Sequence, residues 1–264
     1  MGPEIRTLPL TYEQEAARSE TLRRIETRQG YLVPISVMWG TDVPPLEAEA
    51  ALEGVKDVLE ASGQDRQLMV YGSDTFAIGD YSSATWYISE AFRNQGLRRD
   101  AGYGPQLVTS EMFRLLANEP WQENPHWEVF VVNQDLNTRI NGQYINFVFG
   151  ETQPDFAASV QSVARIRAEI PNPRLRTAMV RRLLRHEVGH MFGLVNRDFN
   201  REFQLGEHCT NVCSMRQGMS MEVWARQLAE EEQAGIHFCQ DCQNDLIGYK
   251  EAYKPLSELP DYLK

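Results

Sequence analysis

Short apolar runs alternate with helical periodicity along the first two thirds of the chain. Runs bounded by turn-forming residues predict strands at 31–39, 67–71, 127–132 and 144–149. Recurrence every three or four residues predicts helices at 10–28, 47–61 and 109–118. Strands and helices mixed in this order predict an α+β fold, with helices packed on one twisted, mixed β-sheet.

Three other parts of the chain have weaker patterns. Residues 73–105 are polar and rich in glycine, so we expect a long loop there with a strand around 85–88. Residues 158–166 alternate imperfectly, which favours a strand. Residues 194–264 have no strand pattern, so we expect a small, mostly helical or irregular subdomain there, after an N-terminal subdomain spanning 1–193.

A helix that carries candidate chemistry is predicted between Asn172 and Gly193, because Asn-Pro favours a helix start and glycine a helix end. Its apolar stripe, which includes Met179 and Leu183, continues with His186 and His190. Glu187 lies on the neighbouring stripe. Burying a carboxylate without a partner costs several kcal/mol. A divalent cation held by the two histidines would offset this cost.

Histidines at positions i and i+4 of a helix present their ring nitrogens to one point, which suits zinc. Glu187, one residue after His186, then lies beside the metal and can act as general base toward a zinc-activated water. H-E-x-x-H also occurs by chance, with the histidines as ordinary core residues. Here further ligand types come soon after the motif, which favours the metal.

The cysteines strengthen this interpretation. All four lie between Cys209 and Cys242, and two of them form a C-x-x-C. The first thirty residues lack the apolar core of a signal peptide, and no apolar stretch is long enough to span a membrane, so we expect a cytoplasmic protein with reduced thiols. Cysteine–metal ligation is therefore favoured over disulfides. The net charge of −11 argues against nucleic acid or an anionic membrane as partner.

The H-E-x-x-H motif and the histidine, cysteine and methionine residues C-terminal to it resemble the archaemetzincins, a family in the metzincin clan. The family pattern is H-E-x-x-H-x-x-G-x-x-H-C, then C-x-M, then a distant C-x-x-C. The likeness covers about residues 127–245 and includes the segments 146–151 and 162–167. It is carried by the residues His186, Glu187, His190, Gly193, His208, Cys209, Cys213, Met215, Cys239 and Cys242.

The resemblance implies a zincin-like fold and a zinc metallopeptidase that acts on a peptide or protein substrate, with two Zn²⁺ per chain. Glu187 would be general base and acid, and Met215 the methionine of the turn beneath the metal. The implied ligands are His186, His190 and His208 for a catalytic zinc, and Cys209, Cys213, Cys239 and Cys242 for a structural zinc. The implied substrate edge strand is Asn146, Phe147, Val148, Phe149 and Gly150.

The chain departs from the family pattern before the third histidine. The family position is occupied by Asn196, and His208 comes twelve residues later, so 195–207 resembles an insertion. Two further departures are a shorter spacing between Cys209 and Cys213 and a longer one from Met215 to Cys239. Asp198 is an alternative third ligand, because carboxylates also bind zinc, whereas Asn196 is a poor one.

The other two histidines have weaker assignments. We expect His126 to be a surface or loop residue rather than a ligand, and His237 could replace a cysteine at the structural zinc. The alternative function is a catalytically latent zinc-binding scaffold of the same fold, with its site covered by the insertion. A nucleic-acid module is a weaker rival. It would use the arginines between Arg174 and Arg185, but the overall charge opposes it.

Overall fold

A five-stranded mixed sheet forms the centre of the protein, in the order β10-β11-β7-β1-β2. The computed structural model describes residues 30–78, 80–96, 98–100, 102–120, 126–140, 143–153 and 158–258. The predicted helix at 10–28 lies outside these residues. The parallel strands are β1 (Ile35–Trp39), β2 (Leu68–Gly72), β7 (Trp127–Val132) and β11 (Ala158–Ser162). Strand β10 (Gly150–Gln153) pairs antiparallel with β11 and forms one edge.

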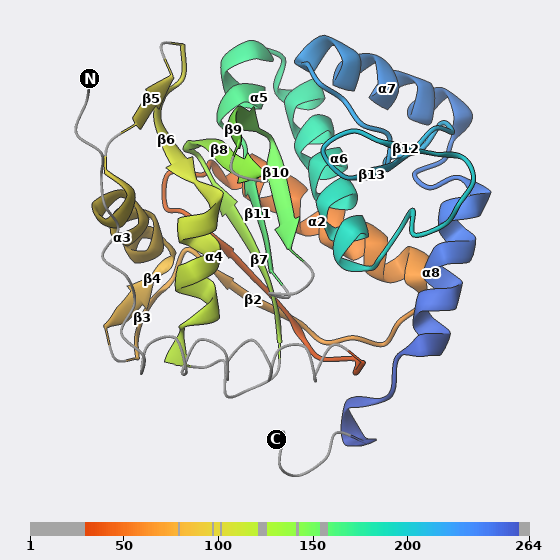
Figure 1. The fold of residues 1–264 in the computed structure, drawn as a ribbon, viewed down its shortest axis with the longest axis horizontal. Coiled ribbons are helices and arrows are strands. Elements are labelled where there is room, and N and C mark those ends of the chain that lie inside the picture. The colour runs from red at the N-terminus through yellow and green to blue at the C-terminus, as the bar shows by residue number, and fades with distance from the viewer. Residues whose placement is uncertain are drawn as a thin grey trace.

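Helices cover both faces of this sheet, as Figure 1 shows. Helices α2 (Pro45–Ser62) and α6 (Pro173–Met191) pack on one face, and α3 (Ala84–Gln95) and α4 (Thr109–Ala117) on the other. All six residues of β7 are buried. This burial explains why five of its six residues are apolar, because a central parallel strand has no face in water.

The segment 73–105 is more structured than its composition predicts. It contains β3 (Thr75–Ile78), β4 (Tyr81–Ser83), α3, β5 (Arg98–Asp100) and the start of β6 (Gly104–Val108). The strand expected at 85–88 is wrong, because those residues belong to α3. Ser83 caps this helix by accepting from Trp86 N, and Ala84, Tyr87 and Ala91 form its buried face.

A four-stranded sheet, in the order β5-β6-β8-β9, lies beside the central one and includes β8 (Asp135–Ile140) and β9 (Gln143–Val148). The region expected as a strand at 158–166 divides into β11 and a short helix, α5 (Ala164–Glu169). Arg165 of α5 forms a two-pronged ion pair with the buried Asp135 of β8, at 2.7 Å for each contact. This pair fastens the second sheet to the segment that leads into α6.

The C-terminal part begins with a turn after α6 and contains a hairpin of β12 (Arg201–Phe203) and β13 (Glu207–Cys209), so the expectation of no strands there is wrong. Helices α7 (Met221–Ala234) and α8 (Gln240–Ala252) come next, then a 3₁₀ turn at Leu256–Glu258. Buried side chains of this part, such as Met215 and Trp224, join the core between α2, α6 and the sheet. The mixed sheet, the long helix α6 and the cysteine-bearing C-terminal part confirm the predicted α+β fold.

No helix in the described ranges combines the length and apolar content needed to cross a membrane. The division into subdomains at residues 193 and 194 stays a prediction. One core cluster contains side chains from both sides of that boundary, including Val37 and Trp224.

His126 is buried at 7% exposure in a position without regular secondary structure, so the expected loop is right and the expected surface location is wrong. Its Nε2 lies 2.9 Å from Glu119 Oε1 and 3.3 Å from Glu128 Oε2. Burial by itself lowers the pKa of His126, but these two carboxylates outweigh it and raise the pKa to about 10. The imidazole is therefore a charged partner inside the fold at neutral pH.

This pair makes stability depend on pH. The pKa of His126 is raised above its value in the unfolded chain, so its stabilising contribution is complete below about pH 6.5 and is lost as pH rises toward 10. We expect His126→Gln to lower the free energy of unfolding by several kcal/mol at pH 6.5 and by much less at pH 10. Denaturant titrations across this range measure the difference. The exposed His237→Gln is the control, and an equal loss at both pH values would contradict the assignment.

Candidate metal centre and cleft

Three imidazoles converge where α6 meets the C-terminal hairpin. His186 and His190 lie one turn apart on α6, and His208 comes from β13. One ring nitrogen of each lies within 4.8 Å of the others. The Nε2 atoms of His186 and His190 are 3.3 Å apart. Two nitrogens bound to one tetrahedral zinc at about 2.1 Å would be about 3.4 Å apart, so this spacing fits zinc.

Backbone carbonyls orient two of these rings. The Nδ1 of His186 lies 2.9 Å from the Ser214 carbonyl oxygen, and the Nδ1 of His208 lies 3.0 Å from that of Gly206. A hydrogen bond from Nδ1–H to a carbonyl leaves Nε2 with a free lone pair, as a metal ligand requires. Burial lowers the pKa of His190 to about 3 and that of His208 to about 4. The donors are therefore neutral at pH 7.

Glu187 lies beside this cluster and is 6% exposed. Thr152 of β10 donates through its Oγ to Glu187 Oε2 or to the Glu187 carbonyl oxygen, each at 2.9 Å. A side chain at Gly150, also on β10, would collide with the carboxylate, since a Cβ there would lie 2.6 Å from Oε1. Burial raises the pKa of Glu187 to about 8, and the Thr152 hydrogen bond lowers it. A cation on the histidines would lower it further.

The four cysteines form a second cluster on the other side of β13. Their sulfurs lie within 4.8 Å of one another and are not joined in disulfides. The Sγ atoms of Cys209 and Cys239 are 3.7 Å apart, close to the roughly 3.8 Å of sulfurs bound to one tetrahedral zinc at about 2.3 Å. Arg197 donates to Cys209 Sγ at 3.2 Å and pairs with Asp245. A cation at this position offsets the negative charge of thiolates.

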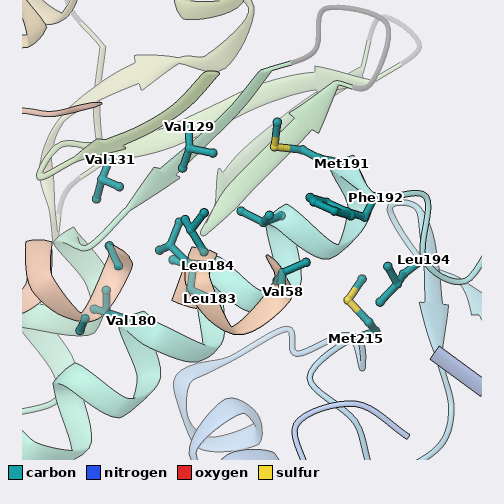
Figure 2. Close-up of a cluster of buried hydrophobic side chains, with 14 of the residues drawn as sticks. Val58, Val129, Val131, Val180, Leu183, Leu184, Met191, Phe192, Leu194 and Met215 are labelled. Carbon is teal, nitrogen blue, oxygen red and sulfur yellow. The ribbon is translucent and has the colours of Figure 1, made fainter. Parts of the chain in front are cut away.

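The two clusters meet at consecutive residues, His208 and Cys209. Successive side chains of a strand point to opposite faces, so β13 presents one residue to each cluster. The amide of Cys209 donates to the Met215 carbonyl oxygen at 3.0 Å. Met215 is fully buried beside Leu194, as Figure 2 shows. Its sulfur packs so closely on α6 that a Cβ at Gly189 would lie 2.4 Å from it.

Buried ion pairs hold the back of α6. Arg182 is fully buried and donates to Glu231 of α7 at 2.8 Å, while Arg185 contacts Asp57 of α2 at 3.1 Å and Ser214 Oγ at 3.2 Å. The nucleic-acid alternative needs Arg185 at the surface, but this side chain is only 3% exposed. Arginines engaged in this way do not form an open basic surface.

A cleft of about 790 Å³ contains the histidine cluster and Glu187. Its lining includes residues 147–153 together with Leu205 and Met219. The segment implied as one substrate edge strand is divided between two strands. Residues 146–148 end β9, whereas Gly150 begins β10 at the edge of the central sheet. Phe147, Val148, Phe149 and Gly150 line the cleft, and Asn146 is exposed outside its lining.

The alternative ligands lie elsewhere. The Asp198 side chain is 99% exposed and pairs with Arg201. Asn196 lines the cleft, but His208 is the residue grouped with the two helix histidines. His237 is exposed near Arg185 and Asp57 and is not part of the cysteine cluster.

Sequence reasoning missed Thr152, Ser214 and Arg197. Ser214 lies in the Cys-Ser-Met sequence, and its position next to the methionine of a candidate turn could have drawn attention to it. Thr152 and Arg197 have no signal of their own. Their roles depend on a strand that reaches Glu187, 35 residues away, and on a loop that reaches Cys209, 12 residues away.

Comparisons with known proteins identify a structural relative at low sequence identity. The chain is similar in structure to a crystallised archaemetzincin from Methanopyrus kandleri, with a TM-score of 0.54 and 19% identity. The match covers 85% of this chain and 98% of that one. The fold is therefore archaemetzincin-like. No protein-family model and no curated protein matches the sequence.

The contact between Gly189 and Met215 can be tested by a double-mutant cycle. Gly189→Ala adds a methyl group against the buried sulfur, so we expect a net loss of about 1 to 2 kcal/mol despite the better helix propensity of alanine. Met215→Ala leaves a cavity that accepts this methyl group. The double variant should therefore be more stable than the sum of the two single changes predicts, by about 1 kcal/mol or more. Strictly additive unfolding free energies would show that these residues do not touch.

Proposed function

We propose that this protein is a zinc-dependent peptidase that hydrolyses peptide bonds in an extended substrate. The observation that carries the proposal is the convergence of three neutral imidazoles and one buried carboxylate in a cleft that is also lined by β10, the edge strand of the central sheet. The archaemetzincin-like fold supports the same activity. Fold alone does not establish function, so the proposal depends on these side chains.

His186, His190 and His208 would hold the catalytic zinc through Nε2, in the neutral state that ligation requires. When bound, zinc supplies Lewis-acid polarisation of the scissile carbonyl and a water of lowered pKa. Glu187 takes a proton from the attacking water and gives it to the leaving amine. Thr152 holds the carboxylate at a fixed angle for both transfers, since its hydroxyl bridges Glu187 and Ser159.

Strand β10 would bind the substrate. It lies at the edge of the central sheet, so its outer backbone groups can pair with an extended chain. Gly150 and Thr152 share the face turned toward Glu187. A substrate strand added at this edge would run beside the base and the three histidines. The resemblance implied residues 146–150 as the substrate edge strand, and Gly150 is the residue of that segment that belongs to β10.

Cys209, Cys213, Cys239 and Cys242 would hold a structural zinc, giving two Zn²⁺ per chain. This metal would fix β13 and so hold His208 in place for the catalytic site. The alternative, a latent scaffold, predicts an inserted segment that covers the cleft. Leu205 and Glu207 of that segment instead line the cleft wall, which favours the peptidase.

Removing the general base separates these two functions. We expect Glu187→Gln to reduce peptide turnover by at least about a thousandfold, because the proton acceptor is lost while the three zinc ligands stay in place. Cleavage of a peptide library by zinc-loaded protein and zinc content per chain measure the two effects. Glu207→Gln, which also removes a carboxylate from the cleft wall, is the matched control and should retain activity. A wild type without turnover would favour the scaffold, and an active Glu187→Gln would exclude Glu187 as the base.

A further inference from the structure

The hairpin of β12 and β13, residues 201–209, carries exposed apolar side chains next to the cleft. We call it the rim hairpin. Phe203 is 79% exposed and Leu205 is 39% exposed, and Met219 faces the same cleft at 45% exposure. Residues 201–207 of this hairpin belong to the segment 195–207, which resembles an insertion relative to the archaemetzincin pattern. Polar groups fasten it to the body, since Gln217 donates to the Gln204 carbonyl oxygen at 3.0 Å.

Leu205 has a backbone conformation that a leucine rarely adopts. Its φ is 57°, in the left-handed region. Within the described ranges, non-glycine residues with positive φ are confined to Val195, Asn200 and Leu205, all in the segment after α6. A left-handed residue with a side chain costs about 1 kcal/mol or more, and glycine would avoid this cost. A leucine in this left-handed conformation therefore indicates that its side chain makes a contact whose benefit offsets the backbone cost.

The position of Leu205 indicates that use. Gly206, the next residue, accepts a hydrogen bond from the His208 imidazole at its carbonyl oxygen, so Leu205 lies close to the candidate catalytic centre. Leu205 and Met219 line the same cleft as residues of β10. A chain paired with β10 directs alternate side chains away from α6 and toward the open cleft. The apolar surface of Leu205 and Met219 is then removed from water favourably only when one of these substrate side chains is apolar.

We propose that Leu205, with Met219, is a specificity-determining contact that selects a bulky apolar side chain in an extended polypeptide substrate. This inference rests on the proposed peptidase function for the identity of the ligand. Two observations indicate an extended polypeptide as the occupant: Leu205 and Met219 belong to the lining of the cleft, and β10, the edge strand of the central sheet, lines the same cleft. Phe203 belongs to the same hairpin but lies outside the cleft lining, so it has no part in the selection.

The test measures peptide binding in the Glu187→Gln protein loaded with zinc, so that no cleavage interferes. The probes are blocked alanine-based octapeptides that carry one leucine or one serine, placed at each position in turn. At one or two positions leucine should strengthen binding by about tenfold over serine, because its side chain leaves water on the cleft wall. Adding Leu205→Gly, which also relieves the left-handed backbone and so should fold normally, is expected to reduce this ratio to about twofold.

Phe203→Ser is the matched control, because it removes a more exposed apolar side chain from the same hairpin and should leave the ratio at about tenfold. Three results would overturn the inference: no preference for leucine, a preference that survives Leu205→Gly, or a preference that Phe203→Ser also abolishes. Absence of measurable binding by every peptide would overturn it as well. Selective binding without cleavage by the wild type would instead contradict the peptidase function and leave the selection at Leu205 supported.

Discussion

The adjacency of His208 and Cys209 in one short strand is the constraint on which the proposed site depends. A three-residue strand has little stability of its own, so something must hold β13 at the end of α6. The backbone bond to Met215 and the pairing with β12 do this in the structure, and a zinc ion bound by the four cysteines would add to them. Since one residue of the pair faces each cluster, any shift of the cysteine cluster moves the third histidine with it.

Helix α6 in turn depends on partners for the polar side chains that it buries. The helix carries two imidazoles and a carboxylate into the core, and burial of these groups costs free energy unless each is paired. Ser214 accepts from His186, Thr152 donates to Glu187, and Arg182 pairs with Glu231. Each partner comes from a different element, so the side chains near the histidines are fixed by the sheet, by the turn before α7 and by α7 itself.

The sequence predicts the elements whose signals are local. Helix α6 begins after Asn172, whose side chain accepts from the amides of Arg174 and Leu175, and it ends just before Gly193, as the capping signals indicate. Helix α3 was missed although Ser83 and the spacing of Ala84, Tyr87 and Ala91 carried the signal. The loop composition of the surrounding residues obscured it.

Other features depend on contacts between distant residues and could not be predicted from local patterns. His126 is buried because Glu119 and Glu128 meet it inside the fold, and no spacing rule connects these three. The rim hairpin has no apolar alternation. Each of its two strands has only three residues, so local propensity gave no indication of the pairing. The histidine and cysteine clusters were predictable as residue sets, whereas Thr152 and Arg197 were not.

The most direct test of the account is the zinc content per chain of the wild type, His208→Ala and Cys242→Ala proteins, measured by mass spectrometry of the metal after dialysis. The account predicts two zinc ions in the wild type and one in His208→Ala, held by the cysteines. Cys242→Ala should retain one or fewer, because losing the cysteine site also loosens His208. Two zinc ions in His208→Ala, or fewer than two in the wild type, would contradict the two joined metal sites.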